Sequence, residues 1–233
     1  MAQANRNTPL RRAKYGLMQH LPGELGLKYR RKLRKLYAPA AEAAFREALT
    51  GAHGKICIDL GANLGQHTRT MAAHAGKVYA FEPDPWTAEK LRTSLADVPN
   101  VEVVEAAAGT EEGTFPLYRT ASFDSDPVEQ SQSSSLMAAK RNIDTDSAVD
   151  VRVIDFPAFL QGLDAEIAVI KMDIEGAEVP LLEVLFDHPV AARIGHLFVE
   201  THESRIPDLL ARTDALRERA SRMTRPCVNM DWK

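Results

Sequence analysis

The stretch KICIDLGANLGQHTRT, residues 55–70, constrains the fold of this chain more than any other. An apolar run ends at Asp59, Gly61 and Gly65 follow, and then comes a polar segment that can begin a helix. Glycine in a loop after a buried strand lets the backbone approach a ligand closely, and the next helix presents unpaired N–H groups. The sequence therefore predicts a strand–loop–helix unit with a ligand at the carboxyl end of the strand.

The rest of the chain alternates between strand and helix patterns. Strands are expected over 55–60, 77–82, 101–106, 149–156, 166–173 and 194–202. Helices are expected over 38–51, about 66–75, 84–96, 157–162, 176–188 and 206–222. Asp84 and Pro85 suit the N-cap and the first position of the helix at 84–96. The alternation predicts an α/β fold, a doubly wound, mostly parallel sheet with helices on both faces, whereas the half-buried pattern at 149–156 suits an antiparallel edge or hairpin.

The composition indicates a globular protein without a membrane-spanning segment. The chain has 233 residues, 45% of them hydrophobic, and no uninterrupted apolar run reaches the roughly 18 residues that a spanning helix needs. The N-terminus lacks the apolar core of a secretory signal, and two cysteines, Cys57 and Cys227, do not make a disulfide framework. We therefore expect a reduced, cytoplasmic protein.

Charge is unevenly distributed along the chain. Residues 1–36 carry ten Lys or Arg and one acid, so they contribute +9 to a net charge of −3, and the remaining 197 residues contribute −12. The densest part, KYRRKLRKLY at 28–37, suits contact with an anionic substrate or with a membrane, where the protein would be peripheral at the inner surface. The commoner arrangement is a helix that packs Leu33, Leu36 and Tyr37 on the acidic body.

Two acids flank the glycine loop. Asp59 can accept a hydrogen bond from an amine or a cation, although it could instead cap a helix, and Glu82 ends the next strand, where a carboxylate can accept both hydroxyls of a ribose. Asn63 stands where a dinucleotide-binding G-x-G-x-x-G loop has its second glycine, and no phosphate-clamping Lys-Ser/Thr follows. S-adenosylmethionine, which has a ribose, an amino group and a sulfonium but no phosphate, fits this pattern better than a dinucleotide.

Six segments between about residues 55 and 203 resemble FkbM-type S-adenosylmethionine-dependent methyltransferases, in the order seen in that family. They are IDLGANLGQHT, VYAFEPDP, VEVVEAAAGTEEGTFPLY, SQSSSL, IKMDIEGAEVPLLEVL and LFVETH. The resemblance implies a class I methyltransferase (Rossmann-like) fold and O-methylation of a hydroxyl, often on a sugar or secondary metabolite. It also implies that Glu82 holds the ribose and that Ala106 and Ala107 border the adenine. The methionine part is expected to contact Asp59, Gly61, Asn63 and Gly65.

Two regions depart from the family pattern. Residues 1–54 match no family motif, and we expect them to form a basic, helical N-terminal extension of a methyltransferase domain at 55–233. Class I methyltransferases usually close the sheet with a strand–helix–strand hairpin. Only about thirty residues follow the strand at 194–202, so we expect a shortened C-terminal edge.

In-line methyl transfer to a hydroxyl needs positioning of that group and a base that takes its proton. Asp173 is the first candidate, because acids at strand ends in this fold face the ligand crevice. The others are Glu175, Glu178, Glu200 and His202, and the ordinary pKa of His202, about 6.5, suits a base near neutral pH. Glu175 could instead cap the helix that begins at Gly176, and His202 could be an ordinary loop histidine.

Two further features stay open at this level. Asp173, Glu200 and His202 could hold a divalent ion, but nothing in their spacing requires one, and we expect a site without metal. The serine-rich stretch at 131–135 suits either a mobile lid over the acceptor or a solvated connector.

The leading hypothesis is therefore an O-methyltransferase for a small-molecule or glycan hydroxyl. A catalytically degenerate cofactor-binding module, recruited through the basic arm, would make the crevice acids dispensable. A nicotinamide-dependent oxidoreductase would need G-x-G-x-x-G, which Asn63 interrupts. No nucleic-acid partner is expected, because the base-targeting Asn/Asp-Pro-Pro-Tyr/Phe signature is absent and the body is acidic.

Overall fold

A six-stranded parallel sheet organises the protein, for which the computed structural model describes residues 7–123, 125–131, 134–141, 143–144 and 146–232. Its strand order is β3-β2-β1-β7-β8-β9, and every pair of neighbouring strands runs parallel. The strands are β1 (Ile56–Leu60), β2 (Lys77–Phe81), β3 (Val101–Val104), β7 (Ile167–Met172), β8 (Ile194–Val199) and β9 (Cys227–Asn229). Strand order reverses between β1 and β7, and in such sheets ligands bind beyond the carboxyl ends at that point.

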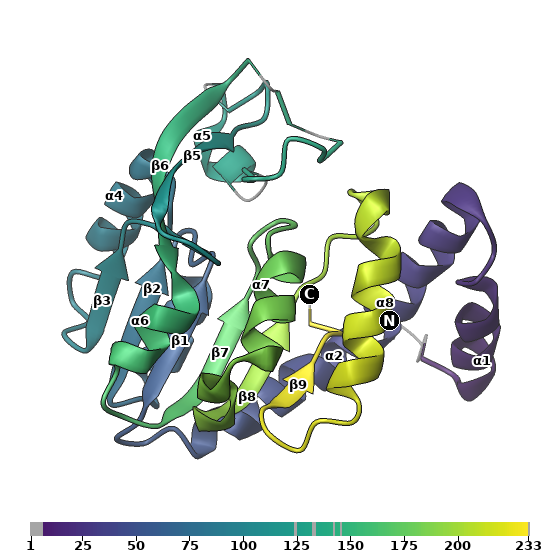
Figure 1. Cartoon of the computed structure of the whole chain (residues 1–233), viewed down its shortest axis with the longest axis horizontal. Coiled ribbons are helices and arrows are strands. Elements are labelled where there is room, and N and C mark those ends of the chain that lie inside the picture. Colours follow the sequence, from purple (N-terminus) through teal and green to yellow (C-terminus); the bar gives the residue numbers. More distant parts are fainter. Residues whose placement is uncertain (1–6, 124, 132–133, 142, 145, 233) are drawn as a thin grey trace, which may run out of the picture.

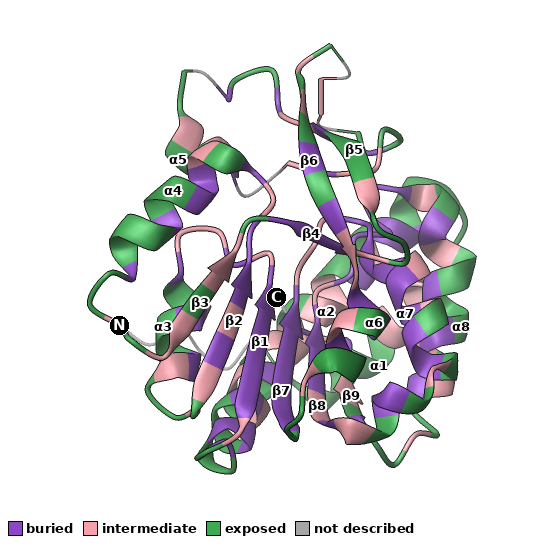
Figure 2. Ribbon diagram, turned by 60° about the vertical axis from the view of Figure 1, so that its left-hand side comes forward, coloured by how far each residue is buried: buried purple, intermediate pink, exposed green. Residues whose placement is uncertain are grey.

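Helices cover both faces of the sheet, as the alternating pattern predicted (Figure 1). One face carries α6 (Phe156–Gly162), α7 (Glu178–Asp187) and α8 (Leu210–Ala220). The other face carries α2 (Gly23–Thr50), α3 (Gln66–Ala72) and α4 (Pro85–Ser94). Because both faces are covered, β1 and β7 are buried along their whole length (Figure 2). The predicted start of α4 is confirmed, since the side chain of Asp84 accepts the backbone N–H groups of Trp86 and Thr87.

The N-terminal region differs from the prediction of a separate helix at 38–51. After α1 (Pro9–Met18), a single helix of 28 residues, α2, runs through Pro39. That prediction was wrong because a proline removes one backbone N–H without ending a helix whose apolar face keeps packing. Ala41, Phe45 and Leu49 of α2 share a core cluster with Cys57, Val169, Phe198 and Trp232, so the boundary expected at 54/55 falls inside one packed core.

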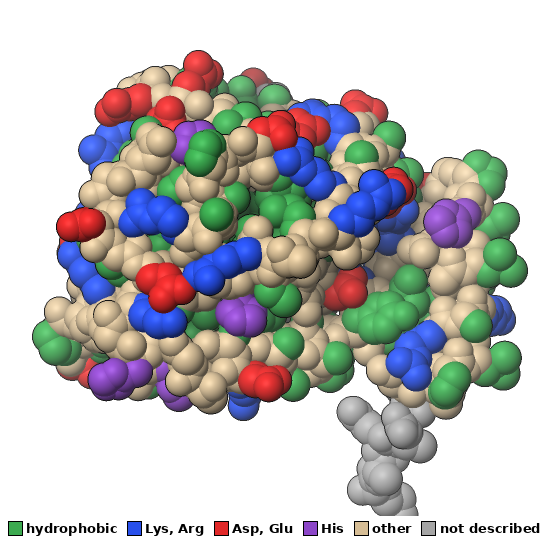
Figure 3. Space-filling view, turned by 60° about the horizontal axis from the view of Figure 1, so that its bottom comes forward, with side chains coloured by type: hydrophobic (Ala, Val, Ile, Leu, Met, Phe, Trp, Pro, Cys, Tyr) green, Lys and Arg blue, Asp and Glu red, His purple; other side chains and the backbone are tan. Residues whose placement is uncertain are grey.

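Part of the basic stretch on α2 packs on the body. Arg30 is buried and donates to both carboxylate oxygens of Asp214, at 2.5 and 2.9 Å. Arg34 donates to the carbonyl oxygen and the hydroxyl of Thr201. Two of the basic side chains therefore fix α2 to α8 and to the segment after β8. The hairpin formed by α1 and the start of α2 projects from the side of the molecule as a separate lobe (Figures 1 and 3).

A small second sheet rises above the carboxyl ends of the main one (Figure 1). Its order is β4-β6-β5, made of β4 (Ala107–Gly109), β6 (Ala148–Asp155) and β5 (Gly113–Tyr118). The predicted strand at 101–106 was too long, because β3 ends at Val104 and the chain then crosses to pair with β6. β5 and β6 are antiparallel, as the pattern at 149–156 suggested, and the short α5 (Pro127–Gln130) lies in the serine-rich connection.

The far edge of the main sheet is short, in agreement with the sequence. After β8, the 3₁₀ turn Pro207–Leu209 and α8 lead back to β9, which has only three residues. Another 3₁₀ turn, Pro189–Arg193, connects α7 with β8. Among the described residues, none of the helices combines the length and the apolar character that crossing a bilayer would take.

Candidate functional site

A cavity of about 830 Å³ lies at the carboxyl ends of the central strands. Its walls come from the loop after β1, the ends of β2, β7 and β8, the small sheet with its serine-rich connection, and Ala38 of α2. This volume is within the range of about 300–1,000 Å³ that is typical of small-molecule sites. The cavity is therefore large enough for a nucleoside-sized ligand together with a second small molecule.

The glycine loop is shaped by contacts inside the protein. A side chain at Gly61, where φ is +75°, would place its Cβ 1.8 Å from the carbonyl oxygen of Asp173. The missing side chain thus lets the loop pass directly against the end of β7, and Gly61 itself lines the cavity. Gly65, with φ +89°, precedes α3 and packs toward Leu91, away from the cavity lining. Asn63 lines the cavity, and its amide donates to Ser131 Oγ at 3.0 Å.

Asp59 lies behind the cavity wall, which differs from the expected cofactor contact. Its side chain is fully buried and accepts the hydroxyl of Thr68 at 2.7 Å. Lys171 Nζ lies 3.2 Å from the Asp59 carboxylate, donates to the carbonyl of Gly61 at 2.9 Å, and lies 3.9 Å from Asp173. Although burial opposes the charge of Lys171, Asp59 and Asp173 raise its pKa. Asp59 therefore acts on the site through Lys171, which does line the cavity.

Glu82, at the end of β2, lines the cavity as predicted but is already bound by backbone. Its Oε2 accepts the N–H of Asn63 at 2.9 Å, and its Oε1 accepts the N–H of Asp84 at 3.0 Å. Burial raises the pKa of Glu82 to about 7, although these two hydrogen bonds oppose the rise. A carboxylate oxygen can accept more than one hydrogen bond, so Glu82 retains capacity for a ligand hydroxyl. Ala106 and Ala107 line the same cavity.

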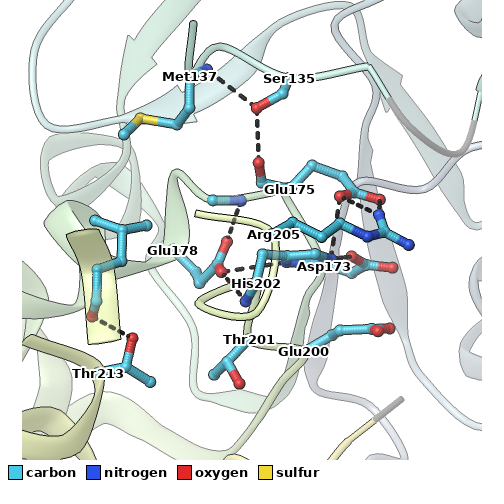
Figure 4. Close-up of polar contacts among 12 residues, drawn as sticks. Ser135, Met137, Asp173, Glu175, Glu178, Glu200, Thr201, His202, Arg205 and Thr213 are labelled. Atoms are coloured by element: carbon cyan, nitrogen blue, oxygen red, sulfur yellow. Dashed lines mark hydrogen bonds and ion pairs between the residues drawn. The ribbon is translucent and has the colours of Figure 1, made fainter. Parts of the chain in front are cut away.

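The ends of β7 and β8 bring an acidic cluster around His202 (Figure 4). His202 Nε2 lies 3.1 Å from Glu175 and 3.6 Å from Asp173. On the other side of the ring, Nδ1 lies 3.2 Å from Glu178. Glu178 is fully buried and also accepts the backbone N–H groups of His202 and Gly176. Glu178 therefore fixes the ring so that Nε2 points toward Asp173 and Glu175.

The charge of His202 follows from this arrangement. Burial opposes the imidazolium, but Glu178, Glu175 and Asp173 outweigh it and raise the pKa of His202 to about 9. The ring is consequently protonated near neutral pH and forms ion pairs with the surrounding acids. This argues against the base role that the sequence suggested for His202.

Glu175 does not cap α7, which begins at Glu178, but lies among three cations. Its carboxylate is 2.8 Å from Lys140 Nζ, 3.0 Å from Arg205 and 3.1 Å from His202. Its backbone has φ +54°, and its carbonyl accepts the hydroxyl of Ser135 at 2.6 Å. The serine-rich stretch is thereby tied to the acidic cluster through Ser135, while positions 132–133 of that stretch lie outside the described residues.

Asp173 is the acid of this cluster that has room for a ligand. It lines the cavity with 29% of its side chain exposed. Its Oδ1 is buried and accepts no hydrogen bond from the described residues. Glu200 also lines the cavity and lies 3.7 Å from Arg34.

The geometric candidate for a metal site is Asp173, Glu175 and His202, whose ligand atoms all lie within 4.8 Å of one another. This set differs from the one weighed on the sequence, which had Glu200 in place of Glu175. Lys140 and Arg205 already neutralise Glu175, and a cation would have to displace the proton of His202. The donor set is therefore better occupied by the protein's own cations than by a metal ion.

Sequence reasoning missed three basic residues of the site, which are Lys140, Lys171 and Arg205. Lys171 had a readable signal, because a lysine within the apolar strand AVIKMD must find a buried partner. Lys140 and Arg205 lie in polar segments, and only tertiary structure brings them to Glu175.

Comparison with protein-family models matches residues 59–223 to the methyltransferase FkbM domain. A search of curated proteins gives no match. Among solved structures, an rRNA methylase from Streptococcus thermophilus is 12% identical, over 77% of this chain and 78% of that one, with a TM-score of 0.41.

Two further structures match smaller parts. A precorrin 8w decarboxylase from Methanobacterium thermoautotrophicum is 16% identical over 62% of this chain and 54% of that one, with a TM-score of 0.34. Phosphoethanolamine N-methyltransferase 1 of Haemonchus contortus, crystallised with phosphoethanolamine and S-adenosylhomocysteine, is 17% identical over 47% and 26%, with a TM-score of 0.24. The chain covers less than two thirds of the length of four solved structures that it matches. All of these TM-scores are low, so the assignment of the chain to a family rests on the family-model match.

Proposed function

The chain belongs to the FkbM methyltransferase domain family, and from this premise we propose that it transfers a methyl group from S-adenosylmethionine to a hydroxyl of a sugar, glycan or secondary metabolite. The observation that carries the proposal is a single cavity of about 830 Å³ lined by both Glu82 and Asp173. These acids come from the ends of β2 and β7, on opposite sides of β1 in the sheet.

The side of the cavity toward β2 suits the nucleoside part of the cofactor. Glu82 offers a buried carboxylate at the position where ribose hydroxyls are held in nucleotide-binding folds. Ala106, Ala107 and Phe81 give this side a small, apolar boundary that suits a flat base. When bound, S-adenosylmethionine supplies a sulfonium methyl group that a nucleophilic oxygen can accept.

The side toward β7 suits the acceptor. Asp173 lines the cavity with 29% of its side chain exposed, so an acceptor hydroxyl can donate to the accessible part of its carboxylate. Asp173 then takes the hydroxyl proton as the bond between the acceptor oxygen and the methyl carbon forms and the bond between sulfur and the methyl carbon breaks. The imidazolium of His202, at 3.6 Å, and Lys171, at 3.9 Å, hold the Asp173 carboxylate in place. Glu175 and Glu200 act in this account as positioning residues rather than as the base.

The remaining lining suits an acceptor with several hydroxyl groups. Gln130, Ser131, Ser134 and Ser135 from the serine-rich connection, together with Arg205, line the cavity. Ser134 Oγ is buried and finds no hydrogen-bond partner within the described part of the chain. A buried hydroxyl without a partner is costly, and a polar ligand group would satisfy it. A polyhydroxylated acceptor fits this wall better than an aromatic one.

A methyl-transfer screen tests the proposal. The full chain is incubated with methyl-labelled S-adenosylmethionine and with fractionated glycan and metabolite extracts, and labelled products are identified after base-resistant and base-labile methyl groups are separated. We expect base-resistant label, as in a methyl ether, in a polyhydroxylated fraction. Cofactor binding without transfer to any fraction would favour the degenerate binding module. Absence of cofactor binding would contradict the proposal altogether.

A further inference from the structure

The hairpin of residues 9–37, made of α1, the turn after it and the first part of α2, is a feature that the methyl-transfer site does not explain (Figure 1). No residue of α1 is buried. α1 contacts α2 through Tyr15 and Tyr29, whose rings lie 5.5 Å apart, with Lys32 Nζ over both rings at 5.7 and 5.1 Å. Contacts between α1 and α2 therefore hold the hairpin together, and the face of α1 that points away from α2 is not covered by the described residues.

The hairpin carries exposed leucine side chains. Seven large hydrophobic side chains are exposed in the described part of the chain, and four of them lie in the hairpin: Leu10, Leu17, Leu21 and Leu25. The exposed fractions of Leu10 and Leu17 are 80% and 75%. Seven residues apart in a helix, these two point the same way, about 140–160° from Tyr15 and hence away from α2. The other three exposed side chains, Phe115, Val128 and Val184, are on three different elements.

The hairpin is also basic. Lys14 follows Leu10 by four residues and precedes Leu17 by three, so it lies between them on the helix surface. The hairpin has nine lysine and arginine side chains and one acid, Glu24, a net charge of +8, whereas residues 38–233 carry −12. Arg30 and Arg34 are paired with the body. Exposed basic side chains on the hairpin include Arg12, Lys14, Lys28, Arg31 and Lys35. Figure 3 shows hydrophobic and basic side chains next to one another on this lobe.

We propose that the hairpin is a peripheral docking surface for an anionic lipid bilayer. The four leucines enter the boundary between headgroups and acyl chains, and the lysines and arginines contact anionic headgroups, as in amphipathic interfacial helices. The acidic body is repelled by the same surface, so the protein is oriented with the hairpin toward the lipid. A second copy of the chain fits less well, because it would bring its own hairpin, with the same net charge of +8, against this one.

Docking would place the site near the membrane. α2 continues from the hairpin to Ala38, which lines the cavity. From Leu25 to Ala38 is 13 residues, or about 20 Å along the helix axis. The cavity would thus open within reach of acceptors held at the bilayer surface.

Co-sedimentation of the full chain with vesicles tests the proposal. We expect binding to phosphatidylcholine vesicles that contain about 30 mol% phosphatidylglycerol, weak binding to pure phosphatidylcholine, and loss of binding as salt is raised. Leu10→Ser with Leu17→Ser should lower the partition coefficient by about tenfold or more, because two side chains that leave water on docking are removed. Lys14→Glu with Lys28→Glu should weaken binding to the anionic vesicles alone.

The matched control is Val184→Ser, which changes an exposed side chain on α7 and should leave vesicle binding unchanged. The leucine variants should keep the wild-type thermal unfolding midpoint, because their side chains are already in water. Unaltered vesicle binding by the double leucine variant would overturn the proposal. So would a concentration-dependent dimer that the same double substitution disperses, since the leucines would then be covered by a second copy.

Discussion

The two sides of the cavity hold their carboxylates in different ways. On the β2 side, Glu82 is held by two backbone N–H groups. On the β7 and β8 side, Asp173 and Glu175 lie among the cationic side chains of Lys140, Lys171, Arg205 and His202. One side therefore relies on neutral donors and the other on fixed positive charge.

This difference decides which charges can change near neutral pH. None of the described cationic side chains bonds to Glu82, and burial raises the pKa of Glu82 to about 7, so a ligand that donates hydrogen bonds can select its ionised form. His202 on the other side has its pKa raised to about 9 by three acids and stays charged. A bound ligand can thus change the ionisation of Glu82 on the β2 side. On the β7 and β8 side, the charges are already fixed before a ligand binds.

The sharpest test of the β7 side is Asp173→Asn. Methyl transfer should fall by about 10² to 10⁴, because the asparagine cannot take the acceptor proton. Cofactor affinity should change less than about twofold, since the β2 side holds the nucleoside. Asp187→Asn, the same substitution at an exposed position of α7, serves as the control in single-turnover and calorimetric measurements. Full activity of Asp173→Asn would remove it as the base.

Substitution of Lys171 removes one of the fixed positive charges on the β7 side. Lys171→Met leaves Asp59 buried without its cation, and the free energy of unfolding should fall by about 3–5 kcal/mol. Denaturant unfolding measures the change, and Asp59→Leu combined with Lys171→Met should recover much of it. The exposed pair Lys77 and Glu102 provides the contrast, because Lys77→Met should cost about 1 kcal/mol or less. Equal costs at the two lysines would contradict the buried ion pair.

Substitution of Glu82 removes the carboxylate of the β2 side and tests whether it contacts the cofactor. Glu82→Ala should weaken S-adenosylmethionine binding by about tenfold or more, through the loss of charge-assisted hydrogen bonds worth about 1.5–3 kcal/mol. Glu102→Ala on the neighbouring strand β3 is the control. If both variants bind like the wild type in calorimetry, the ribose does not contact Glu82.

The most gradual expected effect is a pH dependence of stability from His202. Its folded-state pKa of about 9 exceeds the ordinary value of 6.5, so its contribution is complete below pH 6.5 and is lost as pH rises through 9. The free energy of unfolding should fall between these limits by at most about 1.4 kcal/mol per pH unit from this group. Denaturant titrations of the wild type and His202→Gln should differ in this slope, and parallel slopes would show that the ring is neutral.

The central sheet could be predicted from the sequence because its strands are continuous apolar runs separated by local helix signals. The Asp84 cap and the short edge at β9 follow from such local patterns. The antiparallel pairing of β6 was predicted, but its place in a separate sheet was not, since β4 pairs with β6, about 45 residues away, and nothing local specifies that pairing. The length of α2 was missed because Pro39 resembles a helix boundary in sequence alone.

In the site, the strand ends were predictable and the partners of the side chains were not. Parallel strands place Asp173, Glu200 and His202 at one edge, which spacing and fold class can foresee. The roles changed where contacts are long-range, since Lys171 separates Asp59 from the cavity and Glu178 converts His202 into a charged donor. Gly61 was expected to be a glycine so that a ligand could approach the backbone. In the structure, a side chain at Gly61 would instead clash with the carbonyl oxygen of Asp173.

The most direct test of the account is the affinity for S-adenosylmethionine as a function of pH, measured by calorimetry on the wild type and on Glu82→Gln. If the ligand selects the ionised form of Glu82, the wild type should gain about tenfold in affinity between about pH 6 and about pH 8 relative to the variant, because titration of the ligand itself is common to both. A constant ratio between the two proteins, or no binding by either, would contradict the assignment of this cavity to the cofactor.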